Sequence, residues 1–218
     1  MKKVVIFGTE QFSEILYFFL ETEKEYKVCA FTVDSSFKKT DYFCGLPVIE
    51  FEKIENRYSP KEYDIFICLG YTKMNTIREQ KFLQAKEKGY KILSYQHKSA
   101  LVLSKDFGEG NIIMENVTIG AFCKIGDGNV FWARSHVAHH TCVEDFNFFT
   151  INSAVAGNIH IHKHCFFGNN CTIKNGIDIA DYTLVGAGCY ISKSTERNGV
   201  YVPNRSIKLD KDSMDMKL

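Results

Sequence analysis

Six of the seven histidines in this sequence fall in two short stretches, residues 136–140 and residues 160–164. Histidine exchanges a proton near neutral pH more readily than any other side chain, so either stretch could supply a general base. The alternating His160, His162 and His164 could also ligate a zinc ion. Which chemistry is available depends on the elements that carry these side chains.

A repeat of six residues runs through the second half of the chain. Every sixth residue from Ile113 to Ile191 is large and apolar, in a chain whose overall hydrophobic share is 45%. The position four residues further on is mostly small. No α-helix has a period of six, and a plain strand alternates by two. The repeat therefore predicts a prism-shaped solenoid with three hexads per coil, stacked as parallel strands roughly 4.8 Å apart.

This solenoid decides how the second group of histidines is interpreted. Residues 160, 162 and 164 span a corner between hexads, so their side chains should diverge onto different faces. We therefore expect no metal site there, and favour a solvated corner or a contact with the phosphates of a bound ligand.

Residues 1–97 follow a different pattern. Apolar runs that predict strands alternate with helical patterns, and the runs lie at 2–8, 26–34, 62–70 and 90–95. Apolar residues recur at helical spacing over 10–22, and a charged amphipathic helix is predicted over 73–88, ending at Gly89. This strand–helix order predicts a parallel sheet covered by helices.

Charge and cysteine usage narrow the function. The 218 residues include 27 Lys and Arg against 26 Asp and Glu, a net charge of +1, which argues against a nucleic-acid or anionic-membrane binder. No apolar run approaches a membrane span, and the N-terminus is interpreted as mature protein. None of the eight cysteines forms a CxxC pair, so we expect reduced thiols in a cytoplasmic protein. Four of them occupy small inward positions of the repeat: Cys123, Cys165, Cys171 and Cys189.

The chain resembles the bacterial sugar O- and N-acyltransferases. The likeness is carried by VVIFGTEQFSEIL, CGLPVIE, GYTKMNTIRE, EKGYKILSYQHKSALV, HVAHHTCVEDF and SAVAGNIHIHKHCFFGNNCTI. It implies an α/β N-terminal domain with a Rossmann-like parallel sheet (1–97), then a left-handed parallel β-helix of hexapeptide repeats (98–198) and a tail (199–218). We expect the tail to leave the hexad register, fold back briefly and then fray.

The resemblance also implies an activity. It predicts transfer of an acetyl group from acetyl-CoA to a nucleotide-linked amino sugar in bacterial glycan synthesis such as that of lipopolysaccharide. It further implies a cytoplasmic homotrimer whose active sites lie at the subunit boundaries. Neither a nucleic acid, a membrane nor a metal is expected as a partner.

The general base follows from the same likeness. HVAHHTCVEDF matches the family's base turn at His139, with His140 as the second candidate. The family usually has an acidic residue directly after the base, where this chain has His140. Many members also have a histidine nine residues after the base, where this chain has Phe148.

The coil length places acyl-donor contacts. Gly157 lies 18 residues after His139, so it should stack beside it and bring a backbone N–H close to the thioester carbonyl. Asn175 lies one coil further. The pantetheine arm of the acyl donor is then expected along the groove toward the later coils, near Gly186, Ala187 and Gly188. The requirement for a tight corner in the solenoid explains this Gly-Ala-Gly sequence equally well.

The substrate is expected in the N-terminal domain. FGTEQFSE forms the strand-to-helix turn where parallel sheets bind ligands, but it is not GxGxxG, so dinucleotide binding is not expected. The resemblance assigns nucleotide contacts to six residues in this domain: Gly8, Thr9, Asp34, Gly70, Tyr71 and Lys73. The alternative is that Asp34 is a loop residue whose hydrogen bonds are made within the protein, and that Gly8 and Gly70 are needed only for the shape of their turns.

Three functions remain open at this point. A sugar amine attacks a thioester without strong base assistance once it is positioned, so the altered base turn favours N-acetylation. The second hypothesis is a sugar O-acetyltransferase of the sialic-acid type. The third is a non-catalytic hexapeptide-repeat protein that serves as a structural or regulatory partner.

Overall fold

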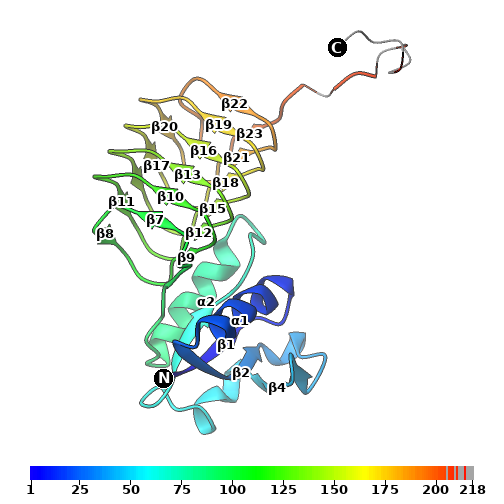
Figure 1. Cartoon of the computed structure of the whole chain (residues 1–218). Helices are drawn as coiled ribbons and strands as arrows, with labels where there is room; N and C mark the ends of the chain where they lie inside the picture. Colours follow the sequence, from blue (N-terminus) through cyan, green and yellow to red (C-terminus); the bar gives the residue numbers. More distant parts are fainter. Residues whose placement is uncertain (205, 209, 211–213, 215–218) are drawn as a thin grey trace.

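The computed structural model describes residues 1–204, 206–208, 210 and 214. A small α/β domain forms one end of the molecule, and a three-sided stack of short strands rises from it (Figure 1). The N-terminal elements are β1 (Lys2–Phe7), α1 (Gln11–Glu23), β2 (Tyr26–Val33), η1 (Ser35–Phe37), β3 (Tyr42–Phe43), β4 (Leu46–Glu50), η2 (Phe51–Asn56), β5 (Asp64–Ile67) and α2 (Thr76–Glu87).

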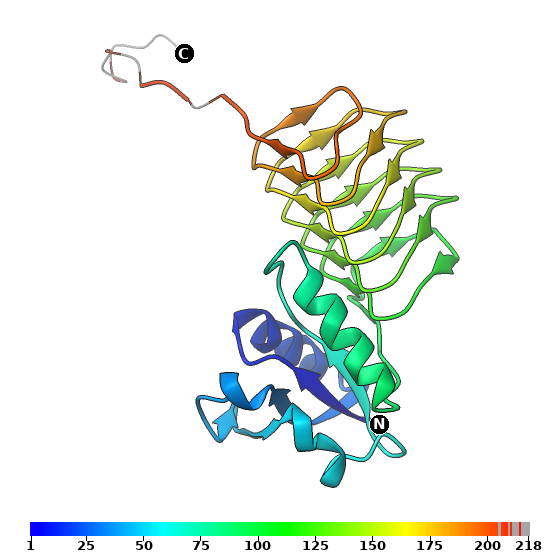
Figure 2. The same cartoon turned by 180° about the vertical axis from the view of Figure 1, so that it is seen from behind.

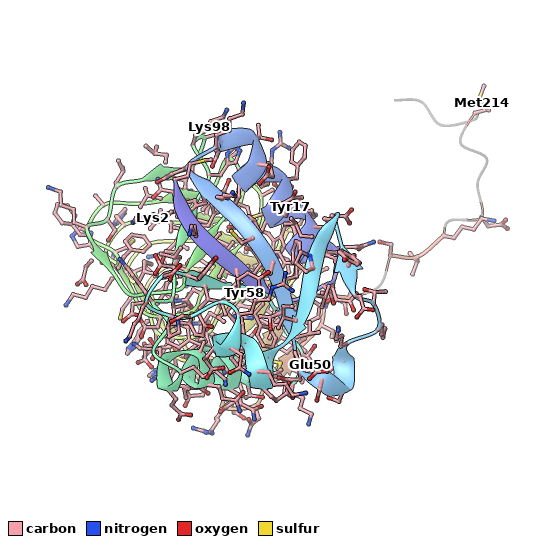
Figure 3. All side chains as sticks on the ribbon, turned by 90° about the horizontal axis from the view of Figure 1, so that it is seen from below. Lys2, Tyr17, Glu50, Tyr58, Lys98 and Met214 are labelled. Atoms are coloured by element: carbon pink, nitrogen blue, oxygen red, sulfur yellow. The ribbon has the colours of Figure 1, made fainter. Side chains whose placement is uncertain are left out.

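The N-terminal sheet has the strand order β3-β4-β2-β1-β5 and is parallel except for the β3–β4 hairpin. Alternate residues of β1 face opposite sides. Val4 and Ile6 pack in one cluster with α1, and Val5 and Phe7 pack in another with η2 and α2. Tyr17 of α1 lies beside β2, where its ring meets that of Phe31 (Figure 3). The predicted parallel sheet covered by helices is therefore present, with helices on both faces.

Two local predictions in this domain were wrong. The run 90–95 does not form a full fourth strand, because only Ile92 bridges β5 while Tyr95 and Gln96 pair with the β-helix. The second helix begins at Thr76 rather than at residue 73. Residues 73–75 all have a left-handed backbone, with φ between 49° and 66°, which a helix start cannot include.

The second part consists of three parallel sheets that share one core. The first contains β6 (Tyr95–Gln96), β9 (Ile112–Ile113), β12 (Val130–Phe131), β15 (Phe148–Phe149), β18 (Phe166–Phe167), β21 (Leu184–Val185) and β23 (Val200–Tyr201). The second contains β7 (Leu101–Val102), β10 (Thr118–Ile119), β13 (His136–Val137), β16 (Ala154–Val155), β19 (Thr172–Ile173) and β22 (Tyr190–Ile191). The third contains β8 (Asp106–Phe107), β11 (Lys124–Ile125), β14 (Cys142–Val143), β17 (His160–Ile161) and β20 (Asp178–Ile179).

The hexad positions form the core of this β-helix, as predicted. Each of the fourteen bulky residues from Ile113 to Ile191 is at most 5% exposed. Pairing follows the predicted spacing of 18 residues, for example Phe131 with Phe149 and Phe149 with Phe167. The rings of these three residues stack with centroids 4.7 and 4.5 Å apart. All eight cysteines are free thiols, and the four assigned to inward positions are buried.

The corners of the β-helix follow the same period. A residue with positive φ recurs every six positions through most of the stack, including Asn152, Asn158 and Asn170. Asparagine tolerates this left-handed backbone better than most side chains. The hexad therefore encodes both the inward bulky residue and the turn between faces.

The ladder of the β-helix extends beyond the predicted boundaries of 98 and 198. It begins with β6 and continues to β23, which pairs in parallel with β21. The tail therefore adds a strand before Pro203 instead of folding back. The prediction for its end concerns residues 205, 209, 211–213 and 215–218, which lie outside the described residues.

The two parts share a hydrophobic interface. Leu16 and Leu20 of α1 belong to the same buried cluster as Ile112, Val130 and Phe148, which project outward from the first sheet. Helix α2 lies beside the end of the β-helix that adjoins the N-terminal domain (Figure 2), and the ring of Phe82 packs edge to face against that of Phe146. Among the described residues, no helix has the length and apolar content needed to cross a membrane.

Candidate active site

His139 and His140 form the corner between β13 and β14. Their Nδ1 atoms lie 3.1 Å apart, so one of them donates a hydrogen to the other. His140 has the left-handed backbone of its corner position and its ring lies 4.8 Å from that of Phe122 on the preceding coil. If His140 accepts from Nδ1–H of His139, then Nε2 of His139 keeps its lone pair. No hydrogen bond to that Nε2 is found in the described part of the chain, so it is available to take a proton.

The ring of His139 lies over Gly157, one coil further along. A Cβ on Gly157 would lie 2.7 Å from Cε1 and 3.0 Å from Nε2 of His139. The coils are joined here by Asn158, whose N–H donates to the carbonyl of His139 at 3.1 Å. Within the described residues, the N–H of Gly157 has no acceptor. The imidazole of His139 and the free N–H of Gly157 therefore lie at the same corner of successive coils, and a base and a hydrogen-bond donor are the two groups that acyl transfer uses.

The remaining residues predicted to bind the acyl donor lie at two different corners. Asn175 follows Gly157 on the same corner and is exposed, and the next residue, Gly176, donates to the carbonyl of Gly157 at 3.2 Å. Residues 186–188 instead lie between β21 and β22, at the corner on the other side of the second sheet, where Ala187 packs against Gly168. A single groove on one chain therefore does not contain all five predicted residues, and that expectation is corrected.

The N-terminal candidates Gly70 and Tyr71 line a hollow of about 530 Å³ between the two domains. The ring of Tyr71 lies 5.2 Å from that of Phe148 and 4.7 Å from that of Phe166. Further lining residues come from α1 and from the corner between the first and second sheets, among them Gln11, Trp132, Thr150, Ile151 and Asn169. These residues were not identified from the sequence. The position of the only tryptophan, Trp132, on the outside of the solenoid could have indicated a contact surface there.

The other N-terminal candidates do not line this hollow. Asp34 forms an ion pair with Lys81 of α2 at 2.7 Å. Gly8 is required by packing, since a Cβ there would lie 2.4 Å from Oγ of Ser13, and Thr9 follows it half-buried. Lys73 is exposed on the left-handed turn before α2.

Arg78 connects the Gly70 loop to the β-helix and was not identified from the sequence. It is 1% exposed and lies on α2. Its guanidinium donates to the carbonyls of Gly70 at 2.8 Å, Gly128 at 2.9 Å and Asn147 at 3.1 Å, and to Oδ1 of Asn75 at 3.1 Å. Burial lowers the pKa of Arg78 to about 9. These contacts fix the Gly70 loop relative to the first sheet.

Phe148 is part of the interdomain packing. It is 3% exposed and lies on the first sheet, where its ring contacts Phe12 of α1 with centroids 6.4 Å apart. The guanidinium carbon of Arg78 lies 5.6 Å from the centre of the same ring. This environment explains why an apolar ring occupies the position nine residues after His139.

The expected divergence of the histidines in 160–164 was wrong for two of them. The rings of His160 and His162 stack with centroids 4.1 Å apart, and both face Glu144. His164 does diverge: it is buried against α2, with Nε2 3.2 Å from Oε2 of Glu79. His162 directly follows β17, and its two-residue spacing from His160 in extended backbone keeps the two side chains on the same face.

No protein-family model matches this chain, and no curated protein sequence matches it. Solved structures match over nearly its whole length. The acetyltransferase domain of PglB from Neisseria gonorrhoeae is 20% identical with a TM-score of 0.81, over 92% of this chain and 96% of that one. WeeI from Acinetobacter baumannii is 21% identical with a TM-score of 0.80, over 92% and 96%. PerB from Caulobacter crescentus, in complex with CoA and GDP-perosamine, is 20% identical with a TM-score of 0.67, over 93% and 92%. The chain therefore shares the fold of these proteins across both of its parts.

Proposed function

We propose that this protein transfers an acetyl group from acetyl-CoA to the amino group of a nucleotide-linked amino sugar. The observation that carries the proposal is the position of His139 over Gly157, with Nδ1 of His139 engaged by His140. His139 removes the proton of the attacking amine, and the N–H of Gly157 stabilises the oxyanion that forms on the thioester carbonyl. The shared fold with acetyltransferases, one of them in complex with CoA and GDP-perosamine, supports this assignment.

The proposed roles extend to the other sequence candidates. Asn175 contacts the acyl donor at the His139 corner, whereas the corner 186–188 would reach the same donor only from a neighbouring subunit. Gly70 and Tyr71 hold the nucleotide sugar in the interdomain hollow. Gly8, Thr9, Asp34 and Lys73, which do not line the hollow, are proposed as further contacts of the nucleotide. The coil is proposed to be left-handed, and a cytoplasmic location fits a protein that uses acetyl-CoA.

The distance between the proposed base and the proposed sugar-binding hollow within one chain supports a homotrimer. The hollow at Gly70 and Tyr71 and the hollow that His140 lines share no residue. They lie at corners on opposite sides of the second sheet. In a ring of three chains, the His139 corner of one subunit would meet the Tyr71 hollow of the next, which would bring base and sugar together.

Mixing variants tests this shared site. His139→Asn and Tyr71→Ala proteins, each low in activity alone, are co-refolded in equal amounts. If sites are shared, mixed trimers contain boundaries with both intact residues, and part of the wild-type activity returns. If each site lies within one chain, the mixture stays as inactive as its components.

Binding tests the function itself. Thermal shift is measured with acetyl-CoA and with a panel of nucleotide-linked amino sugars, using the matching hydroxy sugars as controls. Stabilisation by acetyl-CoA and by an amino sugar supports the proposal, because a ligand of the native state raises the midpoint. Preference for the hydroxy sugar would favour the O-acetyltransferase, and no response to any ligand would favour a non-catalytic protein.

A further inference from the structure

A cluster of Glu144, His160 and His162 lies on the outer surface of the third sheet. Residues His160 and His162 flank the inward Ile161, so both project outward. Strand β14 pairs with β17 so that Cys142 lies opposite His160. Glu144, two residues after Cys142, therefore lies next to His162. The cluster connects two successive coils.

The donor atoms of this cluster are close together. Nε2 of His160 lies 2.7 Å and Nδ1 of His162 lies 3.4 Å from Oε1 of Glu144. One ligand atom from each residue falls within 4.8 Å of the others. A zinc ion with tetrahedral bonds of about 2.0–2.1 Å holds its ligands roughly 3.3 Å apart, and the two measured distances bracket that value. The separation of the two imidazole nitrogens is at most 4.8 Å, so completing the geometry requires the two rings to move toward each other.

We propose that Glu144, His160 and His162 bind one divalent transition-metal ion of the Zn²⁺ class. Two imidazoles and one carboxylate suit zinc and its neighbours, whereas Mg²⁺ and Ca²⁺ prefer oxygen ligands. The ion takes the lone pairs of Nε2 of His160 and Nδ1 of His162, and water completes its coordination. Its structural effect is to cross-link β14 and β17.

The surroundings leave these groups accessible. Their side chains are 29–40% exposed, so an ion can enter without local unfolding. Lys163, which follows His162 in the sequence, is engaged elsewhere, because its Nζ forms an ion pair with Oδ2 of Asp145 at 2.7 Å. His164 is excluded from the cluster by its burial against Glu79. The site does not depend on the proposed acetyl transfer.

Calorimetric titration of the full chain with ZnCl₂ tests the proposal. We expect one tight site per chain, weakened at least tenfold by His162→Gln and by Glu144→Gln. His136→Gln, at an exposed histidine of the second sheet, is the matched control and should bind as the wild type does. The double variant His139→Gln/His140→Gln should also keep the site. Excess Mg²⁺ should not displace zinc.

Thermal unfolding with and without ZnCl₂ gives an independent readout. The wild-type midpoint should rise with zinc, and the rise should disappear in both cluster variants while their midpoints in EDTA match the wild type. The proposal is overturned if zinc binds no tighter than about 0.1 mM, which corresponds to roughly −5.5 kcal/mol. It is equally overturned if His162→Gln and Glu144→Gln bind as well as the wild type, or if the double variant abolishes binding.

Discussion

The imidazole of His139 lies against Gly157 so closely that a Cβ on the glycine would lie 2.7 Å from Cε1 of the ring. Gly157→Ala should therefore displace an exposed ring that can swing away, with little effect on the free energy of unfolding. We expect acetyl transfer to fall by about 10²-fold, the cost of misplacing a catalytic group by roughly 1 Å. Steady-state kinetics and urea unfolding of the same preparation measure both effects.

Gly120→Ala is the matched control for this variant. A Cβ on Gly120 would lie 2.7 Å from the backbone nitrogen of His139, and backbone cannot swing aside. This variant should lose about 1–3 kcal/mol of stability, the usual cost of overpacking. Equal stability losses in the two glycine variants would contradict the geometry described for His139.

His140 should act by accepting a hydrogen bond from His139. His140→Asn keeps an acceptor and tolerates the left-handed backbone, so it should retain most of the turnover. His140→Phe has no acceptor, and Phe122 shows that phenylalanine fits the same corner position one coil earlier. Its turnover should fall at least about tenfold, less than the roughly 10²–10⁴-fold that loss of the general base itself costs. Full activity of the Phe variant, measured at saturating acetyl-CoA, would remove His140 from the mechanism.

Arg78 should hold the Gly70 loop in place. Arg78→Met leaves the buried carbonyls of Gly70, Gly128 and Asn147 without their donor, which should cost about 2–4 kcal/mol of unfolding free energy. Arg197→Met is the control, because its ion pair with Asp181 is exposed and should change stability by less than about 1 kcal/mol. Urea unfolding compares the two, and similar losses would show that Arg78 is not an interdomain anchor.

His164 should make stability depend on pH. Burial lowers the pKa of His164 below 6.5, against the opposing influence of Glu79, while Arg78 and Lys163 act in the same direction as burial. The unfolded chain then binds a proton that the folded chain does not. Stability from this residue is therefore present above pH 6.5 and is lost as pH falls below it, by at most about 1.4 kcal/mol per pH unit.

The comparison with His164→Gln isolates this effect. The difference in unfolding free energy between wild type and variant should be constant above pH 7 and should change between pH 6.5 and 5. His136→Gln, at an exposed position, should follow the wild-type pH dependence throughout. A constant difference for His164→Gln over the whole range would show that His164 titrates normally.

The repeat made the β-helix predictable because one period fixes both packing and spacing. Ile113 to Ile191 line the core as expected, and the 18-residue coil correctly placed Gly157 beside His139. The tail differed because Val200 and Tyr201 find free backbone groups on β21, a pairing that no side-chain period marks.

The site was less predictable because it depends on how separate elements meet. Trp132 and Ile151 line a hollow with Tyr71 only because the domains pack through the outer face of the first sheet. The corner 186–188 was expected along the same groove as Asn175, but the coil places them on opposite sides of the second sheet. His160 and His162 were expected to diverge, whereas both face Glu144.

One measurement tests the central claim most directly. The protein is incubated with acetyl-CoA and a panel of nucleotide-linked amino sugars, while thiol release and product mass are followed together. We expect release of CoA matched by addition of one acetyl group to the amine, and a loss of rate of about 10²–10⁴-fold in His139→Asn. Absence of an acetylated product from every amino sugar, or full turnover by His139→Asn, would contradict this account.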